Sequence, residues 1–217
     1  MRRRDVGSAV VQELLDVVWP TACAGCEGPL VQGRDRICSA CVDAAPAGIW
    51  PIALEGLEEA WGWSPYDHVL GTALRRGKYQ PDPRTLSVLA DLLASAASSL
   101  VGTATHVVPV PRSWRDLLRT GLEPAGVLAR PVAQASSHPV SWLLRRRHGL
   151  SQASLPPGRR GANIRGAFHC VAPVPGARVL LVDDVATTGA TARACSEALR
   201  AAGASQVVLL AACSPHL

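Results

Sequence analysis

From residue 61 to its end, the chain alternates between short apolar runs and longer stretches of helical spacing. Strands are predicted from the short runs, at residues 61–66, 105–110, 179–182 and 206–213. Helices are predicted where apolar residues recur every three or four positions, at residues 68–77, 85–100, 126–133 and 190–202. Strands that alternate with helices are typical of an α/β fold. We therefore expect three layers and a mostly parallel sheet.

The N-terminal part follows a different pattern. Residues 8–18 have helical spacing and predict a short amphipathic helix, because polar side chains interrupt the apolar run that a secretory signal would need. Residues 44–60 are rich in Ala, Pro and Gly and predict a linker with a strand-like end at 49–54. Two units are therefore expected, at residues 1–50 and 51–217, of which the second is the α/β domain.

Composition narrows the class of protein. The 217 residues are 48% hydrophobic, and no apolar run approaches the length of a membrane span, so we expect a soluble globular protein. The formal net charge of +5 is compatible with phosphate-rich ligands or nucleic acid. Seven cysteines in a chain without a recognisable export signal favour thiols that stay reduced, and therefore a cytoplasmic location.

Four of the cysteines form two CxxC pairs, Cys23, Cys26, Cys38 and Cys41. Each pair brings two thiolates together in a tight turn, and four sulfurs satisfy the tetrahedral coordination of Zn²⁺. Because four protein ligands leave no open position for a substrate, the zinc is expected to be structural. Unmetallated thiols are the alternative. A DNA-reading ribbon is disfavoured, because the loop between the pairs carries only Arg34 and Arg36 as basic residues and no aromatic side chain.

Two adjacent acids, Asp183 and Asp184, directly follow the apolar run at 179–182. The carboxyl end of a parallel strand is where open α/β sheets bind ligands. A Thr-Thr-Gly turn comes next, and the predicted helix begins behind it. The amides of a helix start hold a phosphate, while acids accept hydrogen bonds from ribose hydroxyls or reach Mg²⁺ through water. The pattern therefore predicts a sugar-phosphate site, with ordinary helix capping as the alternative.

The segment DDVATTGAT resembles the motif with which type I phosphoribosyltransferases bind 5-phosphoribosyl 1-diphosphate (PRPP). In that family the acids contact the ribose 2′- and 3′-hydroxyls, which implies this role for Asp183 and Asp184. The loop wraps the 5′-phosphate, which implies a role for Ala186, Thr187, Thr188, Gly189, Ala190 and Thr191. Purine-handling members have an aspartate at the position of Thr187, whose hydroxyl cannot take a proton near neutral pH. The resemblance thus implies ribose-phosphate binding more than transfer to a purine.

The strand predicted at 105–110 ends in a Pro-Val-Pro sequence and is followed by three arginines, Arg112, Arg115 and Arg119. In type I phosphoribosyltransferases the corresponding loop holds pyrophosphate. Guanidinium groups match phosphate oxygens in geometry and charge. The resemblance therefore implies that these arginines bind the pyrophosphate, and a solvent-exposed basic helix face is the alternative.

As a whole, the chain resembles the ComF-like family, in which a zinc ribbon precedes a phosphoribosyltransferase-like domain. The resemblance rests on the paired cysteines and on the sequence KYQPD at 78–82. In the basic loop at 144–168 it rests on Gln152, Leu155, Arg160, Asn163 and Phe168. This loop is expected to close over PRPP as a lid. The family's RGFNQ segment is altered to RTGLEP at 119–124, which affects the expected pyrophosphate handling.

The resemblance implies a role in natural competence, in which imported single-stranded DNA is processed with a helicase partner. Three hypotheses follow. An enzyme would use PRPP with Mg²⁺ and release pyrophosphate through an oxocarbenium-like state. A binding protein would keep the pocket as a sensor of PRPP or a nucleotide, which Thr187 and the altered segment at 119–124 favour. A DNA-binding adaptor rests on charge alone.

Overall fold

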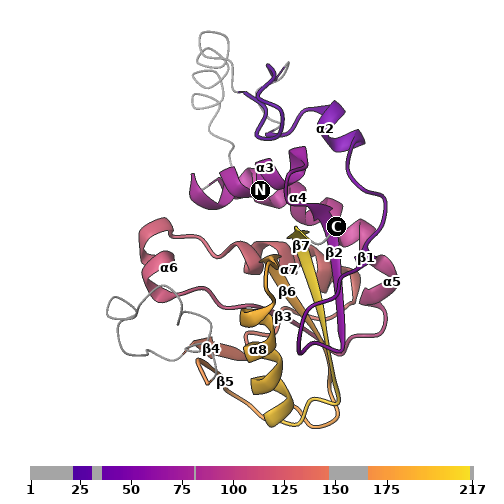
Figure 1. The fold of residues 1–217 in the computed structure, drawn as a ribbon, viewed down its shortest axis with the longest axis vertical. Coiled ribbons are helices and arrows are strands. Elements are labelled where there is room, and N and C mark those ends of the chain that lie inside the picture. The colour runs from indigo at the N-terminus through magenta and orange to yellow at the C-terminus, as the bar shows by residue number, and fades with distance from the viewer. Residues whose placement is uncertain (1–21, 31–35, 81, 147–165, 216–217) are drawn as a thin grey trace, which may run out of the picture.

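The computed structural model describes residues 22–30, 36–80, 82–146 and 166–215 (Figure 1). The predicted helix at residues 8–18 lies outside these ranges. Much of the predicted lid, with Gln152, Leu155, Arg160 and Asn163, lies outside them too, as does Arg34. None of the helices in the described ranges has the length and apolar character needed to cross a membrane.

A five-stranded sheet runs through the described part, with strand order β1-β2-β7-β6-β3. Its strands are β1 (Trp50–Pro51), β2 (Glu59–Pro65), β3 (His106–Pro109), β6 (Arg178–Val185) and β7 (Gln206–Ser214). β1 pairs antiparallel with β2, whereas the pairs β2–β7, β7–β6 and β6–β3 are parallel. The prediction of a mostly parallel sheet is confirmed.

Helices cover both faces of the sheet and complete three layers (Figure 1). On one face lie α3 (Val69–Tyr79), α4 (Pro83–Ala96), α5 (Ser98–Val101) and α7 (Pro124–Ala135). On the other lie α8 (Ala190–Ala201) and the hairpin of β4 (Leu144–Arg146) and β5 (Phe168–Cys170). Two short helices, α2 (Ser39–Asp43) and α6 (Trp114–Thr120), lie outside these layers. The predicted three-layer α/β fold is confirmed.

β6 is an inner strand, because it pairs with β7 on one side and with β3 on the other. Leu180 and Val182 belong to the core under α3, α4 and α7, while Val179 and Leu181 belong to the core under α8. Burial on both faces explains why this strand is a continuous apolar run rather than an alternating one. The residues that follow the run are thereby placed at the carboxyl edge of the sheet.

The single helix predicted at 85–100 is divided in the structure. α4 ends at Ala96, and α5 begins at Ser98. Ala97 is fully buried, and its N–H donates to the carbonyl of Leu93 as a helix cap. The chain turns at this point, and α5 packs against α7.

The predicted loop at 144–168 begins and ends in regular structure. Its two ends are the strands β4 and β5, which pair antiparallel and place Phe168 in the core under α8. A pairing between residues so far apart in the chain leaves no local sequence pattern, so the hairpin was not predicted. The strand-like end expected at 49–54 is confined to Trp50–Pro51.

Gly71 in α3 allows this helix to approach the chain that leaves β2. A Cβ atom at this position would lie 2.4 Å from the carbonyl oxygen of Tyr66 and 2.9 Å from that of Pro65. Gly71→Ala is therefore expected to lower the free energy of unfolding by about 2 kcal/mol, because the backbone must move. Urea denaturation measures this loss, with Gly102→Ala as control because a Cβ there meets nothing within 4 Å. Equal stability of the two variants would contradict the close packing.

Candidate functional site

The carboxyl ends of β3 and β6 open into a cleft of about 310 Å³. Its walls come from the end of α3, the segment after β3, α6, the start of α7, β4, the end of β6 and the start of α8. The charged side chains of the lining are Lys78, Arg112, Arg119, Arg146, Asp116, Glu123, Asp183 and Asp184. Open α/β sheets bind ligands at this edge, so the cleft is the candidate site.

Asp183 and Asp184 lie near the end of β6, and both line the cleft. Each residue is 8% exposed. The Asp183 Oδ1 atom accepts a hydrogen bond from the Asp184 N–H at 2.8 Å, and Asp184 Oδ2 lies 2.7 Å from Lys78 Nζ. Burial, and then the neighbouring Asp184 charge, raise the pKa of Asp183. The two predicted ribose contacts therefore lie together, and one of them is paired with a lysine.

Lys78 reaches the cleft from the last turn of α3, with its side chain 20% exposed. Burial by itself would lower the pKa of Lys78, but the charge and hydrogen bond of Asp184, with a smaller effect from Asp183, raise this pKa overall. Lys78 therefore stays a cation that can meet a phosphate. The sequence singled out Lys78 only through the KYQPD resemblance, because its ion pair joins the end of α3 to β6.

The turn between β6 and α8 contains the six predicted phosphate-loop residues. Gly189, with φ of 71°, precedes the first residue of α8, and a Cβ there would lie 3.0 Å from Leu54. The Thr188 hydroxyl accepts from the Ala190 N–H at 3.4 Å, which is a capping contact. Of the six residues, Thr191 lines the cleft. The exposure of the six residues differs. Ala186 and Gly189 are buried, Ala190 and Thr191 are half-buried, and Thr187 and Thr188 are exposed.

The three predicted arginines take different positions. Arg112 and Arg119 line the cleft, and Arg115 is absent from its lining. The guanidinium carbon of Arg115 lies 5.6 Å from the centre of the Trp114 ring. Arg112 donates to the Thr120 hydroxyl at 3.1 Å and to a backbone carbonyl at 3.3 Å. The fold therefore brings two of the three arginines to the predicted acids.

Three further charged residues line the cleft, and two of them, Asp116 and Glu123, were not predicted. Asp116 accepts a hydrogen bond of 2.6 Å from the Ser113 hydroxyl, and this bond is the main reason that the pKa of Asp116 is lowered. Glu123 Oε1 accepts from the Arg112 N–H at 3.3 Å. Arg146 comes from β4, inside the segment that was predicted as a loop. Asp116 has the sequence position of an ordinary helix-capping residue, which hid its place in the cleft.

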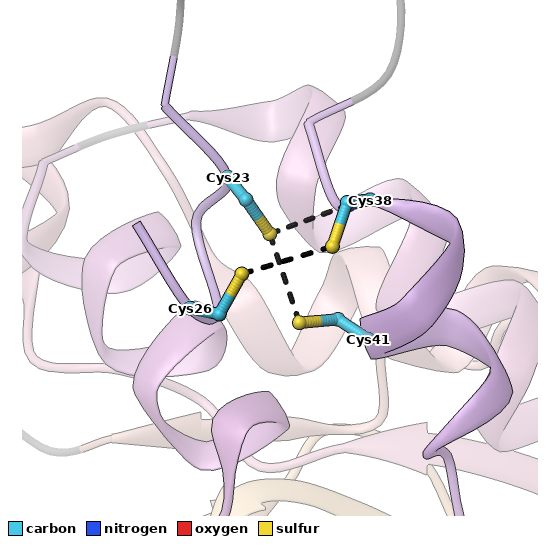
Figure 2. A group of neighbouring side chains, drawn as sticks. All are labelled: Cys23, Cys26, Cys38 and Cys41. Carbon is cyan, nitrogen blue, oxygen red and sulfur yellow. Dashed lines mark hydrogen bonds between the residues drawn. The ribbon is translucent and has the colours of Figure 1, made fainter. Parts of the chain in front are cut away.

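The four predicted zinc ligands come together in the structure (Figure 2). Their sulfur atoms all lie within 4.8 Å of one another. The Cys23 and Cys41 sulfurs are 3.8 Å apart, and those of Cys26 and Cys38 are 3.7 Å apart. Tetrahedral zinc with Zn–S bonds of about 2.3 Å requires sulfurs about 3.8 Å apart. The cluster could therefore hold a metal ion such as zinc.

Backbone amides favour the thiolate form of one ligand. Burial by itself would raise the pKa of Cys23, but the N–H groups of Cys26, Cys38 and Gly25 outweigh burial and lower this pKa. The Gly25 and Cys38 amides lie 3.4 and 3.3 Å from the Cys23 sulfur. Amides that point at ligating sulfurs are a common second layer of structural metal sites. This arrangement fits a metal-bound thiolate.

The cysteine cluster is attached to the helix that carries Lys78. Arg76 in α3 donates to the carbonyls of Cys23 and Ala24, at 3.4 and 3.1 Å, and pairs with Glu27. Cys23 and Cys41 also belong to the same hydrophobic core as the buried face of α3. The metal-binding segment and the cleft therefore share one helix.

No family model matches the chain. The DNA utilization protein YhgH of Escherichia coli K12 is 27% identical over 198 residues, which cover 89% of this chain and 84% of that protein. The predicted resemblance to the ComF-like family is confirmed. The Salmonella typhi protein of the same name is 28% identical over 128 residues, or 58% of this chain. The chain spans little more than half, 56%, of the length of that relative.

The chain is also similar to a transferase. The adenine phosphoribosyltransferase of Kineococcus radiotolerans is 35% identical over 133 residues, which cover 60% of this chain and 63% of that protein. Among solved structures, the allosteric regulatory enzyme of purine biosynthesis superposes with a TM-score of 0.46 and 24% identity, over 64% of this chain and 30% of that chain. Sequence similarity to the transferase, together with the mostly parallel sheet, identifies a phosphoribosyltransferase-like fold.

Proposed function

We propose that the cleft binds a ribose phosphate such as PRPP, together with Mg²⁺. The observation that carries the proposal is the placement of Asp183 and Asp184 in one cleft with Thr191, at the start of α8. Carboxylates accept hydrogen bonds from ribose hydroxyls, and the amides of a helix start attract a phosphate. Two consecutive elements of the chain, β6 and α8, thereby supply both halves of a sugar-phosphate site.

Each charged group of the cleft has a role in this proposal. Asp183 and Asp184 hold the ribose, and the turn at residues 186–191 holds the 5′-phosphate. Lys78, Arg112 and Arg119 are the cations available to the substituent at C1. Mg²⁺, when bound, would neutralise phosphate charge. In a transferase, the acids would hold the ribose in its oxocarbenium-like state, and the cations would stabilise the departing pyrophosphate.

Replacement of both acids tests the site. Asp183→Asn combined with Asp184→Asn is expected to weaken binding of ribose 5-phosphate and of Mg²⁺-PRPP at least about 10-fold, because amides are weaker acceptors and do not attract Mg²⁺. Isothermal titration calorimetry measures the two Kd values. Asp91→Asn, at an exposed position of α4, controls for the loss of one negative charge. Unchanged affinity in the double variant would rule out the proposed site, as would absence of binding by the unmodified chain.

Release of pyrophosphate separates an enzyme from a binding protein. It is measured by incubating the chain with Mg²⁺-PRPP and a panel of nucleobases. Release that disappears in the double variant supports transferase activity. Binding without release supports a sensor or docking protein, which is the outcome that the Thr187 hydroxyl favours because it offers no base.

A second candidate function is binding of single-stranded DNA, with a helicase as partner in competence. Relatives carry the name DNA utilization protein. Arg145 is exposed and lies beside Trp142, which is 41% exposed. Nucleic-acid bases stack on exposed aromatic rings, and phosphates pair with arginine. Salt-dependent retention on single-stranded DNA that falls in Arg145→Ala supports this candidate, with the exposed Arg130→Ala as control. Retention that is insensitive to both changes contradicts it.

The cysteine cluster is proposed to hold a structural Zn²⁺. The four sulfurs complete the coordination, so the ion offers no position for a substrate. The division of the chain into residues 1–50 and 51–217, and a cytoplasmic location, stay predictions.

A further inference from the structure

The cysteine cluster and the cleft are joined through the last turn of α3. Arg76 and Lys78 are two positions apart in this helix, and two residues of an α-helix rotate by about 200°, so the two side chains leave on nearly opposite sides. Arg76 donates to the carbonyls of Cys23 and Ala24 at 3.4 and 3.1 Å. On the other side, Lys78 Nζ lines the cleft and lies 2.7 Å from Asp184 Oδ2. One turn of helix therefore connects the two sites.

A second contact holds the chain beyond α3. We call residues 22–30 and 36–43 the metal-binding segment, because they contain the four cysteines. The Nε atom of Arg36, in this segment, lies 3.3 Å from Asp82 Oδ2. Asp82 is also the N-cap of α4, where it accepts hydrogen bonds from two groups of the first turn. The chain on both sides of Lys78 is therefore attached to the metal-binding segment.

The shape of these attachments depends on the cysteine cluster. The carbonyls that Arg76 contacts belong to the first CxxC turn, and the Ala24 N–H of that turn donates to the Arg36 carbonyl at 2.9 Å. The buried residues of the segment belong to the core that also contains α3, so the segment has no separate core of its own. In such segments a metal that joins the sulfurs supplies much of the folding energy. Occupancy of the cluster should therefore determine where Arg76 and Arg36 find their partners.

The position of Lys78 matters most for one part of a ribose-phosphate ligand. An ammonium group has three N–H donors, so Lys78 can contact Asp184 and a phosphate oxygen at once. The attraction between two charges halves when their distance doubles, so a small shift of the end of α3 removes much of it. Ribose 5-phosphate has no charged group at C1, whereas PRPP has a pyrophosphate there. A displaced Lys78 should therefore weaken PRPP more than ribose 5-phosphate.

We infer that Arg76 and Arg36 are positioning residues, through which the metal-binding segment holds Lys78 in the cleft. Occupancy of the cysteine cluster thereby sets the affinity of the cleft for a phosphorylated substituent at C1. The inference rests on the proposed function, since it uses the same contacts for the ribose and the 5′-phosphate. It adds a link between the metal and the ligand.

Calorimetry with the full, zinc-loaded chain compares Mg²⁺-PRPP with ribose 5-phosphate. Arg76→Ala is expected to weaken Mg²⁺-PRPP about 10-fold and ribose 5-phosphate less than about 2-fold. Arg36→Ala should cause a smaller loss of the same kind, about 3-fold, because its ion pair with Asp82 is partly exposed. Arg84→Ala removes an exposed arginine from α4 and should leave both affinities unchanged. Atomic absorption verifies that every variant keeps its zinc.

Lys78→Met tests whether Arg76 acts through Lys78. This change keeps an apolar side chain and removes the charge, so it should weaken Mg²⁺-PRPP about 10-fold. In the Lys78→Met background, Arg76→Ala should add less than about 2-fold, because losses are not additive when one residue acts through the other. Arg76→Lys retains a charged donor for the carbonyls and should bind Mg²⁺-PRPP more tightly than Arg76→Ala.

Removal of zinc tests the link between the metal and the ligand. The chain is treated with a chelator, desalted and titrated below its melting temperature, with circular dichroism to verify folding. Binding of Mg²⁺-PRPP should weaken about 10-fold and recover when zinc is restored, while ribose 5-phosphate changes less than about 2-fold. If the zinc-free chain is unfolded, the comparison of Arg76→Ala with Arg84→Ala decides.

The outcomes separate this inference from the proposed function. Equal weakening of both ligands by Arg76→Ala would mean that the arginine serves folding alone, and this result overturns the inference, as do unchanged affinities. Additive losses in the double variant overturn it too, because Arg76 would then act independently of Lys78. In each of these cases the unmodified chain still binds, and the proposed function stands. If the unmodified chain binds neither compound, the proposed function is wrong and this inference fails with it.

Discussion

Cys41→Ser is expected to lower the free energy of unfolding by about 4 kcal/mol, or the melting temperature by about 10 °C. Loss of one ligand opens the coordination sphere of the proposed zinc. Cys41 is also almost fully buried in the core shared with α3, so release of the segment exposes that core to water. Removal of the metal from the unmodified chain with a chelator should lower the melting temperature by a similar amount.

Thermal unfolding under reducing conditions measures the change, and atomic absorption measures the zinc content. One zinc per chain is expected after purification without chelator. Cys170→Ser is the matched control, since Cys170 lies in β5, outside the cluster, and its sulfur donates to the backbone carbonyl of Ala172. A melting temperature of Cys41→Ser equal to that of the control, or less than one zinc per chain, would show that the ion is not structural.

The adjacent acids of the cleft are expected to respond in opposite directions to the same replacement. Asp183→Asn should stabilise the chain at neutral pH, because burial and the Asp184 charge make the Asp183 carboxylate unfavourable. The asparagine still offers an oxygen to the Asp184 N–H. Asp184→Asn should destabilise it, because Lys78 loses its partner at 2.7 Å. A difference of about 3 kcal/mol between the two variants is expected.

The effect of pH on Asp183→Asn has a definite sign. The folded chain raises the pKa of Asp183 above its ordinary value, so the folded state holds this proton more tightly than the unfolded state does. This proton adds to the free energy of unfolding. The contribution is fully present below the ordinary aspartate pKa, about 3.9, and is lost as pH rises through the raised pKa. Asparagine does not titrate. The advantage of Asp183→Asn should therefore be absent near pH 4 and should grow as pH increases.

Urea denaturation between pH 4 and 9 measures the free energy of unfolding of both variants, with Asp91→Asn as the control. The stabilised variant should at the same time bind ribose phosphate more weakly, since a site that holds like charges together sacrifices stability for binding. Equal destabilisation by both asparagines, at every pH, would mean that the acids serve folding and not a ligand.

Local sequence patterns were sufficient for most elements of the fold. The apolar run at 179–182 predicted an inner strand, because burial on both faces demands consecutive apolar residues. The Thr-Thr-Gly turn predicted the start of α8, and two CxxC pairs predicted a four-sulfur cluster, because capping and metal coordination both depend on spacing over a few residues. These predictions concern neighbours in the chain.

The pairing of Lys78 with Asp184, the position of Asp116 and Glu123 in the cleft, and the β4–β5 pairing were decided only by the tertiary structure. Each depends on residues from separate elements that meet when α3, α6 and β4 surround the end of β6. By itself, the sequence determined which side chains could bind a ribose phosphate and a metal. Only the folded chain decided which charges face that ribose phosphate, because electrostatic energy depends on distance in space and not on position along the chain.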